Sequence, residues 1–130
     1  MQHKLEEELA QAALRVQKNA YAPYSNFLVG AAIRTASGKI VQGCNFENAS
    51  FGLSICAEQA AVAAMIAGGE REIAMVAVAT RGAVTPCGAC RQIMAEFGLN
   101  FTLILVDTET QMVQHRWLMN ELLPASFKLL

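Results

Sequence analysis

The residues best suited to chemistry in this sequence are three cysteines and one glutamate in two short stretches. Cys56 and Glu58 lie in "CAE", ahead of an alanine-rich apolar run, and Cys87 and Cys90 lie in "PCGAC". Two cysteines separated by two residues can hold one metal ion, and a third cysteine from a neighbouring segment completes a three-ligand zinc site with an open fourth position. The spacing therefore predicts Zn²⁺ bound by Cys56, Cys87 and Cys90.

Glu58 is placed to move protons at the open position of that site. Zinc lowers the pKa of a bound water from about 15.7 towards roughly 7, which makes hydroxide available at neutral pH. Because Glu58 follows a predicted ligand by two residues, its carboxylate can exchange protons with that water without binding the metal. We therefore expect hydrolytic chemistry with Glu58 as the proton shuttle.

Two other interpretations of the cysteines are weaker. A Cys-x-x-Cys pair alone is also compatible with a redox motif, but a redox motif does not need the upstream Cys-Ala-Glu. A purely structural zinc site needs a fourth ligand, and the spare thiol, Cys44, lies in a predicted strand where a small buried hydrophobe is the commoner role. His3 and His115 are expected at the surface.

The elements that position these residues follow from hydrophobic periodicity and from turn residues. Both cysteine stretches begin helices, where the partial positive charge of the helix N-terminus favours thiolates. Ser54 is predicted to cap the first of these helices. The pattern predicts helices over 4–18, 56–67 and 88–97, strands over 27–35, 39–46, 73–80, 101–106 and 111–115, and a short helix ending at Leu123. Two strand–helix–strand passages beside a hairpin indicate an α/β layered sheet.

Composition limits the classes of function. The chain has 130 residues, which we interpret as a single domain over 1–130, and its hydrophobic content of 54% is high for its size and favours an oligomer. Ten Lys plus Arg stand against eleven Asp plus Glu, so the basic excess that nucleic-acid binding usually requires is missing. The charged N-terminus and the lack of a long apolar run predict a cytoplasmic protein with no membrane segment.

Side chains outside the cysteine stretches are expected to serve the fold. Trp117 and the six methionines are predicted to pack in the core, because apolar side chains at such spacings are core residues far more often than cofactor contacts. The acidic run of Glu6, Glu7 and Glu8 is predicted to form a solvated helix face.

The two cysteine stretches resemble the zinc signature of the cytidine deaminase family, specifically its small homotetrameric branch, in which all three ligands are cysteines. Three further segments, "YAPYSNFLVGAA", "GCNFENASF" and "LLPASF", resemble the family's N-terminal, nucleoside-binding and C-terminal segments. The resemblance implies a three-layer α/β/α fold with a five-stranded mixed sheet, one Zn²⁺ per subunit, and a homotetramer with shared active sites. It also implies hydrolytic deamination of cytidine or deoxycytidine to uridine or deoxyuridine and ammonia in pyrimidine salvage, with zinc-bound hydroxide attacking C4.

The resemblance also implies roles for individual residues. Glu58 would protonate N3 of the base and the leaving amine. The implied substrate contacts are Phe27 and Ala57 at the pocket wall, Asn45 and Glu47 on the ribose 3′-hydroxyl, and Phe127 on the base in a neighbouring subunit. Alternation in "NFEN" would point Asn45 and Glu47 to one face of an extended segment, which suits a shared grip on one hydroxyl.

One position departs from the family pattern. The family usually carries arginine directly after Cys-Ala-Glu, whereas this chain has Gln59. A neutral amide can donate hydrogen bonds to thiolates but cannot offset their negative charge. Either the activity is lower, or another cation such as Arg91, adjacent to Cys90, compensates.

Three functions are compatible with the sequence. The leading hypothesis is a free-nucleoside deaminase. The alternatives are a deaminase of another aminopyrimidine, such as a nucleoside antibiotic, and a catalytically idle domain stabilised by zinc. Enzymes that edit polynucleotides are disfavoured by the short chain and the lack of a basic excess.

Overall fold

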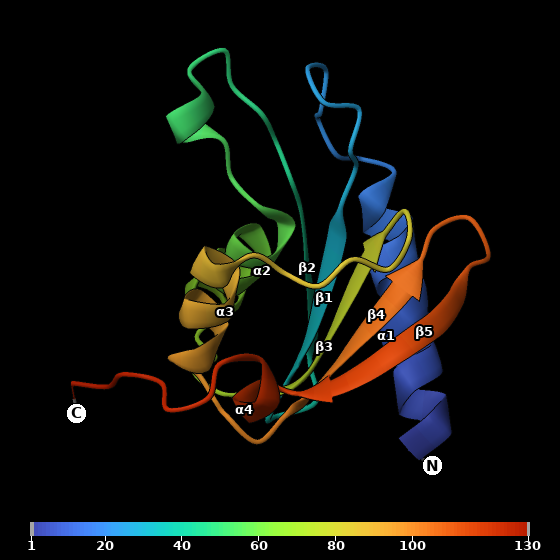
Figure 1. The fold of residues 1–130 in the computed structure, drawn as a ribbon. Coiled ribbons are helices and arrows are strands. Elements are labelled where there is room, and N and C mark those ends of the chain that lie inside the picture. Colours follow the sequence, from blue (N-terminus) through green and yellow to red (C-terminus); the bar gives the residue numbers. More distant parts are fainter. Residues whose placement is uncertain (1, 130) are drawn as a thin grey trace.

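The computed structural model describes residues 2–129, which form one sheet with helices on both faces (Figure 1). The helices are α1 (Gln2–Gln17), the 3₁₀ turn η1 (Phe51–Leu53), α2 (Ala57–Ala67), α3 (Gly88–Ala95) and α4 (Met119–Leu122), and the strands are β1 (Gly30–Thr35), β2 (Ile40–Cys44), β3 (Ile73–Thr80), β4 (Thr102–Asp107) and β5 (Met112–Leu118). Within these residues no helix has the length and apolar character needed to cross a bilayer.

The sheet formed by residues 2–129 has five strands in the order β2-β1-β3-β4-β5. Strands β3 and β4 are parallel, while β1 pairs antiparallel with both β2 and β3, and β4 pairs antiparallel with β5. The parallel pair is joined through α3, as a parallel connection requires a crossover element. The predicted five-stranded mixed sheet is confirmed.

Alternation along the strands divides the core into two layers. Ala77 and Ala79 of β3 pack towards α1, whereas Val76 and Val78 pack towards α2 and α3. Strand β3 is buried at nearly every position, which explains its uninterrupted apolar sequence. Figure 1 shows α1 on one face of the sheet and α2, α3 and α4 on the other. The predicted three-layer α/β/α fold is therefore confirmed.

Two glycines allow helices to approach the β1–β2 hairpin at backbone distance. A Cβ atom at Gly43 of β2 would overlap the backbone of Ala61 in α2, and one at Gly30 of β1 would overlap the backbone of α1 at Ala13. Only a residue without a side chain fits such an approach. Because Gly43 seats α2 directly on β2, it also determines where the first turn of α2, with Cys56 and Glu58, lies relative to the sheet.

The predicted Ser54 cap of α2 is wrong. The N-cap residue is Cys56, and it makes no side-chain capping bond. The Ser54 hydroxyl instead accepts a hydrogen bond from the backbone N–H of Asn48, 3.2 Å away. The 3₁₀ turn at Phe51–Leu53 folds the segment after β2 back on itself, so Ser54 stabilises that loop rather than the helix.

Two expectations about side-chain burial are also wrong. Glu6 is buried, because it pairs with Arg116 of β5 across 2.8 Å. Trp117 and Met112, both on β5, are 36% and 64% exposed and contribute little to the core. Both corrections involve β5, which lies at the edge of the sheet. His3 and His115 are exposed, as predicted.

Candidate active site

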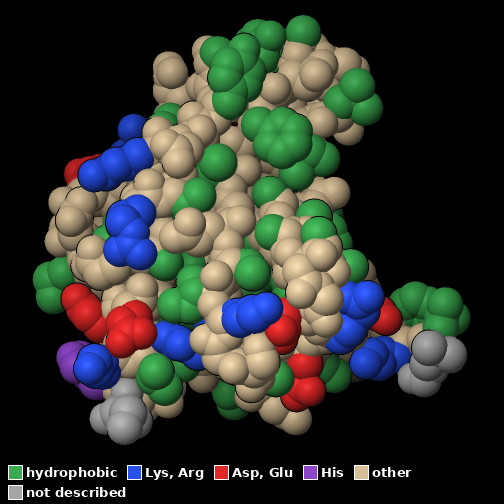
Figure 2. All heavy atoms as spheres, turned by 180° about the vertical axis from the view of Figure 1, so that it is seen from behind, with side chains coloured by type: hydrophobic (Ala, Val, Ile, Leu, Met, Phe, Trp, Pro, Cys, Tyr) green, Lys and Arg blue, Asp and Glu red, His purple; other side chains and the backbone are tan. Residues whose placement is uncertain are grey.

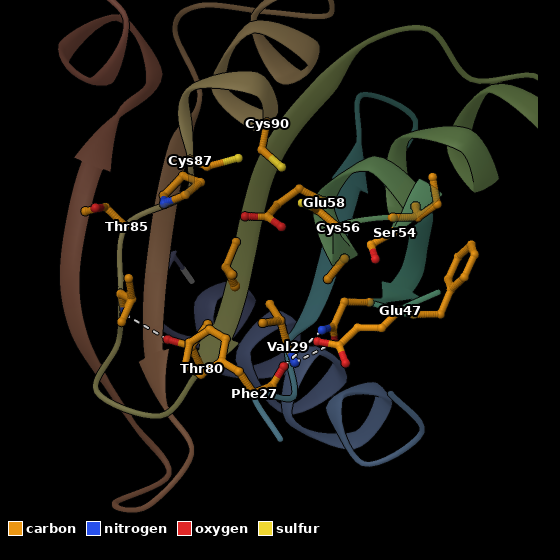
Figure 3. Close-up of a pocket in the computed structure, with 17 residues that line it drawn as sticks. Phe27, Val29, Glu47, Ser54, Cys56, Glu58, Thr80, Thr85, Cys87 and Cys90 are labelled. Carbon is orange, nitrogen blue, oxygen red and sulfur yellow. Dashed lines mark hydrogen bonds between the residues drawn. The ribbon is translucent and has the colours of Figure 1, made fainter. Parts of the chain in front are cut away.

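Three thiols from two helix starts lie together in the structure (Figure 3). Cys56 is the N-cap residue of α2, Cys87 is the N-cap residue of α3, and Cys90 lies in the first turn of α3. Their Sγ atoms all lie within 4.8 Å of one another. The structure therefore brings together the three cysteines that the sequence selects as ligands.

The fold explains why segments so far apart in sequence converge. Helices α2 and α3 pack side by side on the same face of the sheet. In the sequence, α2 precedes β3 and α3 follows it. The loop that follows β3 delivers Cys87 to the start of α3 next to the start of α2. Ligand sites in α/β sheets form at the carboxyl ends of the parallel strands, where such loops meet.

The pKa values of the three thiols are shifted in different directions. Backbone N–H groups at the start of α3, chiefly that of Cys90, lower the pKa of Cys87. Burial raises the pKa of Cys56, and burial together with the negative charge of Glu58 raises that of Cys90. A divalent cation offsets the repulsion between thiolates and the carboxylate. Since thiolates are preferred zinc ligands and three of them leave a position open, the donors fit Zn²⁺.

Glu58 lies beside the thiols and is 5% exposed. It occupies the first turn of α2, and its carboxylate points towards the three sulfur atoms (Figure 3). Burial raises its pKa, which shifts the proton affinity of the carboxyl towards the range useful for proton transfer near neutral pH. The arrangement provides a buried proton carrier within the site and next to the metal donors.

A pocket of about 380 Å³ opens onto this group, which is large enough for a small molecule. Its lining includes the three cysteines and Glu58 and, among the predicted substrate contacts, Phe27, Asn45, Glu47 and Ala57. Phe127 does not belong to this lining and is 67% exposed on the C-terminal segment. The structure thus gathers the predicted contacts in one pocket, apart from Phe127.

Sequence reasoning missed the pocket wall supplied by the loop after β3. Val84, Thr85 and Pro86 line the pocket together with Thr80 at the end of β3. The Thr80 hydroxyl accepts a hydrogen bond from the backbone N–H of Val84, 2.7 Å away, which holds this loop. The sequence does contain a signal for this wall, because the loop joins the apolar strand at 73–80 directly to the predicted metal ligands in "PCGAC".

Asn45 and Glu47 hold the wall that carries Phe27. The Asn45 side chain accepts a hydrogen bond from Val29 N–H at 2.8 Å and donates one to the Phe27 carbonyl at 2.9 Å. Oε1 of Glu47 accepts from the backbone N–H groups of Tyr24 and Ser25, and Oε2 accepts from the Ser25 hydroxyl. Both side chains therefore organise the segment between α1 and β1 before any ligand is bound.

Gln59 and Arg91 are the two residues that the sequence relates to the charge of the thiolates, and they lie in α2 and α3. Gln59 is exposed in the first turn of α2. The Arg91 guanidinium donates from Nε to the Pro86 carbonyl at 2.8 Å and from Nη1 to the Leu122 carbonyl at 3.0 Å. Arg91 thus ties the turn before Cys87 to α4, and these bonds of its guanidinium run to carbonyl oxygens rather than to thiols.

Comparison with known proteins agrees with this geometry. Residues 3–106 match the family described as "Cytidine and deoxycytidylate deaminase zinc-binding region". The chain is 40% identical over 121 residues to the cytidine deaminase of Halalkalibacterium halodurans, covering 92% of this chain and 91% of that protein. It is 47% identical over 94 residues to that of Mycobacterium tuberculosis, covering 71% of each chain.

Solved structures show the same likeness. The crystal structure of cytidine deaminase from Burkholderia pseudomallei superimposes with a TM-score of 0.86 at 43% identity, covering 92% of this chain and 97% of that one. A crystal structure of dCMP deaminase from the cyanophage S-TIM5 shares the fold, with a TM-score of 0.57 at 22% identity.

Proposed function

The chain belongs to the cytidine and deoxycytidylate deaminase family, and from this premise we propose that it hydrolyses the free nucleosides cytidine and deoxycytidine to uridine and deoxyuridine with release of ammonia. The enzyme is a zinc-dependent cytidine deaminase, with Cys56, Cys87 and Cys90 as the metal-binding residues. The observation that carries the proposal is the buried Glu58 carboxylate beside three convergent thiols in a pocket of nucleoside size.

Each part of the reaction has a group in the pocket. Bound to the three cysteines, Zn²⁺ supplies a water that is nucleophilic at neutral pH. Glu58 accepts the proton of the attacking water and delivers protons to N3 of the base and to the departing amine, which leaves as ammonia. Phe27, Val29 and Val78 line the pocket with apolar surface and exclude bulk water around the ring.

The sugar is recognised by the hydrogen-bonding positions of Asn45 and Glu47 that the bonds within the protein do not use. Glu47 has about four acceptor positions on its two oxygens, and the protein fills three of them, leaving one on Oε2. Asn45 Nδ2 donates one hydrogen to Phe27 and retains a second. Asn45 and Glu47 both line the pocket. A donor and an acceptor in one pocket suit a hydroxyl, which both accepts and donates, and we assign this pair to the ribose 3′-hydroxyl.

Ultraviolet absorbance during incubation with a panel of substrates tests this function. We expect turnover of cytidine and deoxycytidine, and at least tenfold lower kcat/KM for free cytosine and for 3′-deoxycytidine, because both leave the Asn45 and Glu47 groups unpaired. Faster turnover of a cytosine-type antibiotic than of either nucleoside would favour the aminopyrimidine alternative. Inactivity of the zinc-loaded protein on the whole panel would favour an idle domain.

Exposed hydrophobic side chains support the proposal that the protein forms an oligomer. Large hydrophobic side chains gather at the end of the molecule where the loops beside the pocket project (Figure 2), among them Tyr21 at 59%, Tyr24 at 55%, Phe46 at 47%, Phe51 at 78% and Leu53 at 64% exposure. A cluster of large exposed hydrophobic side chains is typical of a protein interface. We propose that the cluster is covered in a homotetramer, and that Phe127 reaches the pocket of a neighbouring subunit.

Replacing Phe127 by Ala should raise the KM for cytidine about tenfold while the kcat changes little. The reason is the loss of aromatic contact with the bound base across the subunit boundary. Steady-state kinetics would measure the change, and analytical ultracentrifugation would check that the variant is still a tetramer. Leu129→Ala is the matched control, since Leu129 is 86% exposed on the same segment. An unchanged KM in Phe127→Ala, or a fully active monomer, would contradict the shared site.

A further inference from the structure

The Ser25 hydroxyl stands between a substrate contact and the pocket wall. It donates a hydrogen bond to Oε2 of Glu47 and accepts one from the backbone N–H of Phe27 at 3.0 Å. We propose that Ser25 is a positioning residue for nucleoside binding, which orients the Glu47 carboxylate and fixes Phe27 at the same time. This proposal rests on the sugar contact assigned to Glu47 above.

The donor and acceptor count makes the hydroxyl specific. A serine hydroxyl has one hydrogen to give and two lone pairs to receive, so it can link the Phe27 N–H to the carboxylate in one chain of bonds. The backbone N–H groups of Tyr24 and Ser25 both go to Oε1 of Glu47. Oε2 therefore depends on the Ser25 hydroxyl for its orientation, and Oε2 is the oxygen with an acceptor position left for the substrate.

The bond between Ser25 and Phe27 spans a turn of the backbone. Asn26, between the two residues, has a φ of 59°, in the left-handed region that asparagine adopts more readily than most residues. The Ser25 bond to Phe27 closes over this turn, and Asn45 holds the next residues through Phe27 and Val29. The same serine bond is the main cause that lowers the pKa of Glu47, which keeps the carboxylate ionised and able to accept from a hydroxyl.

Kinetics of Ser25→Ala test the proposal. Since a hydrogen bond to a charged group is worth about tenfold or more in an equilibrium constant, we expect the KM for cytidine to rise about tenfold, with the kcat within about twofold of wild type. Ser25→Thr keeps the hydroxyl and should restore the KM to within about threefold. With 3′-deoxycytidine, which lacks the hydroxyl in question, Ser25→Ala should lower kcat/KM less than it does with cytidine, because only the bond to Phe27 is then lost to the substrate.

A matched control is available elsewhere on the surface. Ser37 also donates its hydroxyl to an exposed carboxylate, Oε1 of Glu70 at 3.0 Å, away from the pocket. Ser37→Ala should leave the KM unchanged, which separates the loss of any surface serine–carboxylate bond from the loss of this one. An unchanged KM in Ser25→Ala would overturn the proposal, as would an equal loss in Ser25→Thr.

A second measurement does not depend on activity. Carboxyl carbon NMR on the substrate-free protein should show the pKa of Glu47 rising in Ser25→Ala and returning in Ser25→Thr. If the wild-type protein fails to deaminate cytidine but the Glu47 pKa behaves in this way, the serine link stands and the proposed function fails. The positioning role is wrong if the pKa of Glu47 does not move in Ser25→Ala. It is also wrong if Ser25→Ala has a lower melting temperature or a different oligomeric state than the wild type.

Discussion

Replacing Glu58 by Gln should lower the kcat for cytidine about 10⁴-fold or more while zinc content and fold are retained. A positioned acid or base typically contributes about 10²- to 10⁴-fold, and one carboxyl serves several proton transfers here, so the upper end is expected. Glutamine has nearly the same shape and cannot carry a proton between water, N3 and the amine. Single-turnover kinetics and metal analysis would measure the two quantities.

The same substitution makes a separate statement about stability. Burial raises the pKa of Glu58, so the folded protein holds this proton more tightly than the unfolded chain does. Ionisation of Glu58 therefore removes stability from the metal-free protein as the pH rises through the folded pKa. Because a glutamine cannot ionise, metal-free Glu58→Gln should melt no lower than the wild type at neutral pH.

The effect on activity has a matched control in Glu96→Gln, at the exposed end of α3. Near-normal deamination by Glu58→Gln would contradict the assignment.

Replacing Gln59 by Arg should raise kcat/KM at neutral pH by about 10- to 100-fold, the usual effect of groups that surround metal ligands. Three thiolates on one divalent ion leave a negative cluster, and an arginine in the first turn of α2 would offset it. Gln59 is exposed, so the longer side chain has room. Steady-state kinetics would measure the gain, and competition with a chelator would measure zinc affinity independently. Gln114→Arg adds the same charge on the exposed face of β5 and should change neither value.

Arg91 provides the opposing test. Its bonds to the Pro86 and Leu122 carbonyls favour a role in holding the turn before Cys87 over direct neutralisation of the thiolates. If Gln59→Arg has no effect while Arg91→Gln removes activity at normal zinc content and melting temperature, Arg91 is the compensating charge. If neither substitution alters activity or zinc affinity, the charge balance argued here is wrong.

Local sequence patterns predict an element well where the burial of that element is evident from its own apolar residues. The continuous apolar run of β3 was predicted at 73–80 and is observed there. The strand predicted at 111–115 extends to Leu118, because its length is determined by pairing with β4 from Thr102 onward. The helix predicted to Phe97 ends at Ala95. Partners distant in sequence decide such boundaries, and no local pattern reports them.

The candidate site divides in the same way. Cys56, Glu58, Cys87 and Cys90 could be predicted because the chemistry of metal ligation restricts both residue type and spacing. The pairing of Glu6 with Arg116 spans nearly the whole chain, and the bonds from Glu47 to the segment at Ser25 join two separate loops. Contacts of this kind depend on the tertiary fold, so the sequence alone predicted a solvated Glu6 and offered no reason to select Ser25.

The convergence of two helix starts across β3 also affects the denatured chain. A metal ion held by Cys56 and Cys87 acts as a cross-link that closes a loop of about 30 residues, and cross-links over loops of that size lower the entropy of the unfolded state by the equivalent of about 3 to 4 kcal/mol. The loop contains the whole of α2 and β3, the elements against which β1 and β4 assemble. For a newly synthesised chain, metal supply and folding are therefore parts of a single equilibrium.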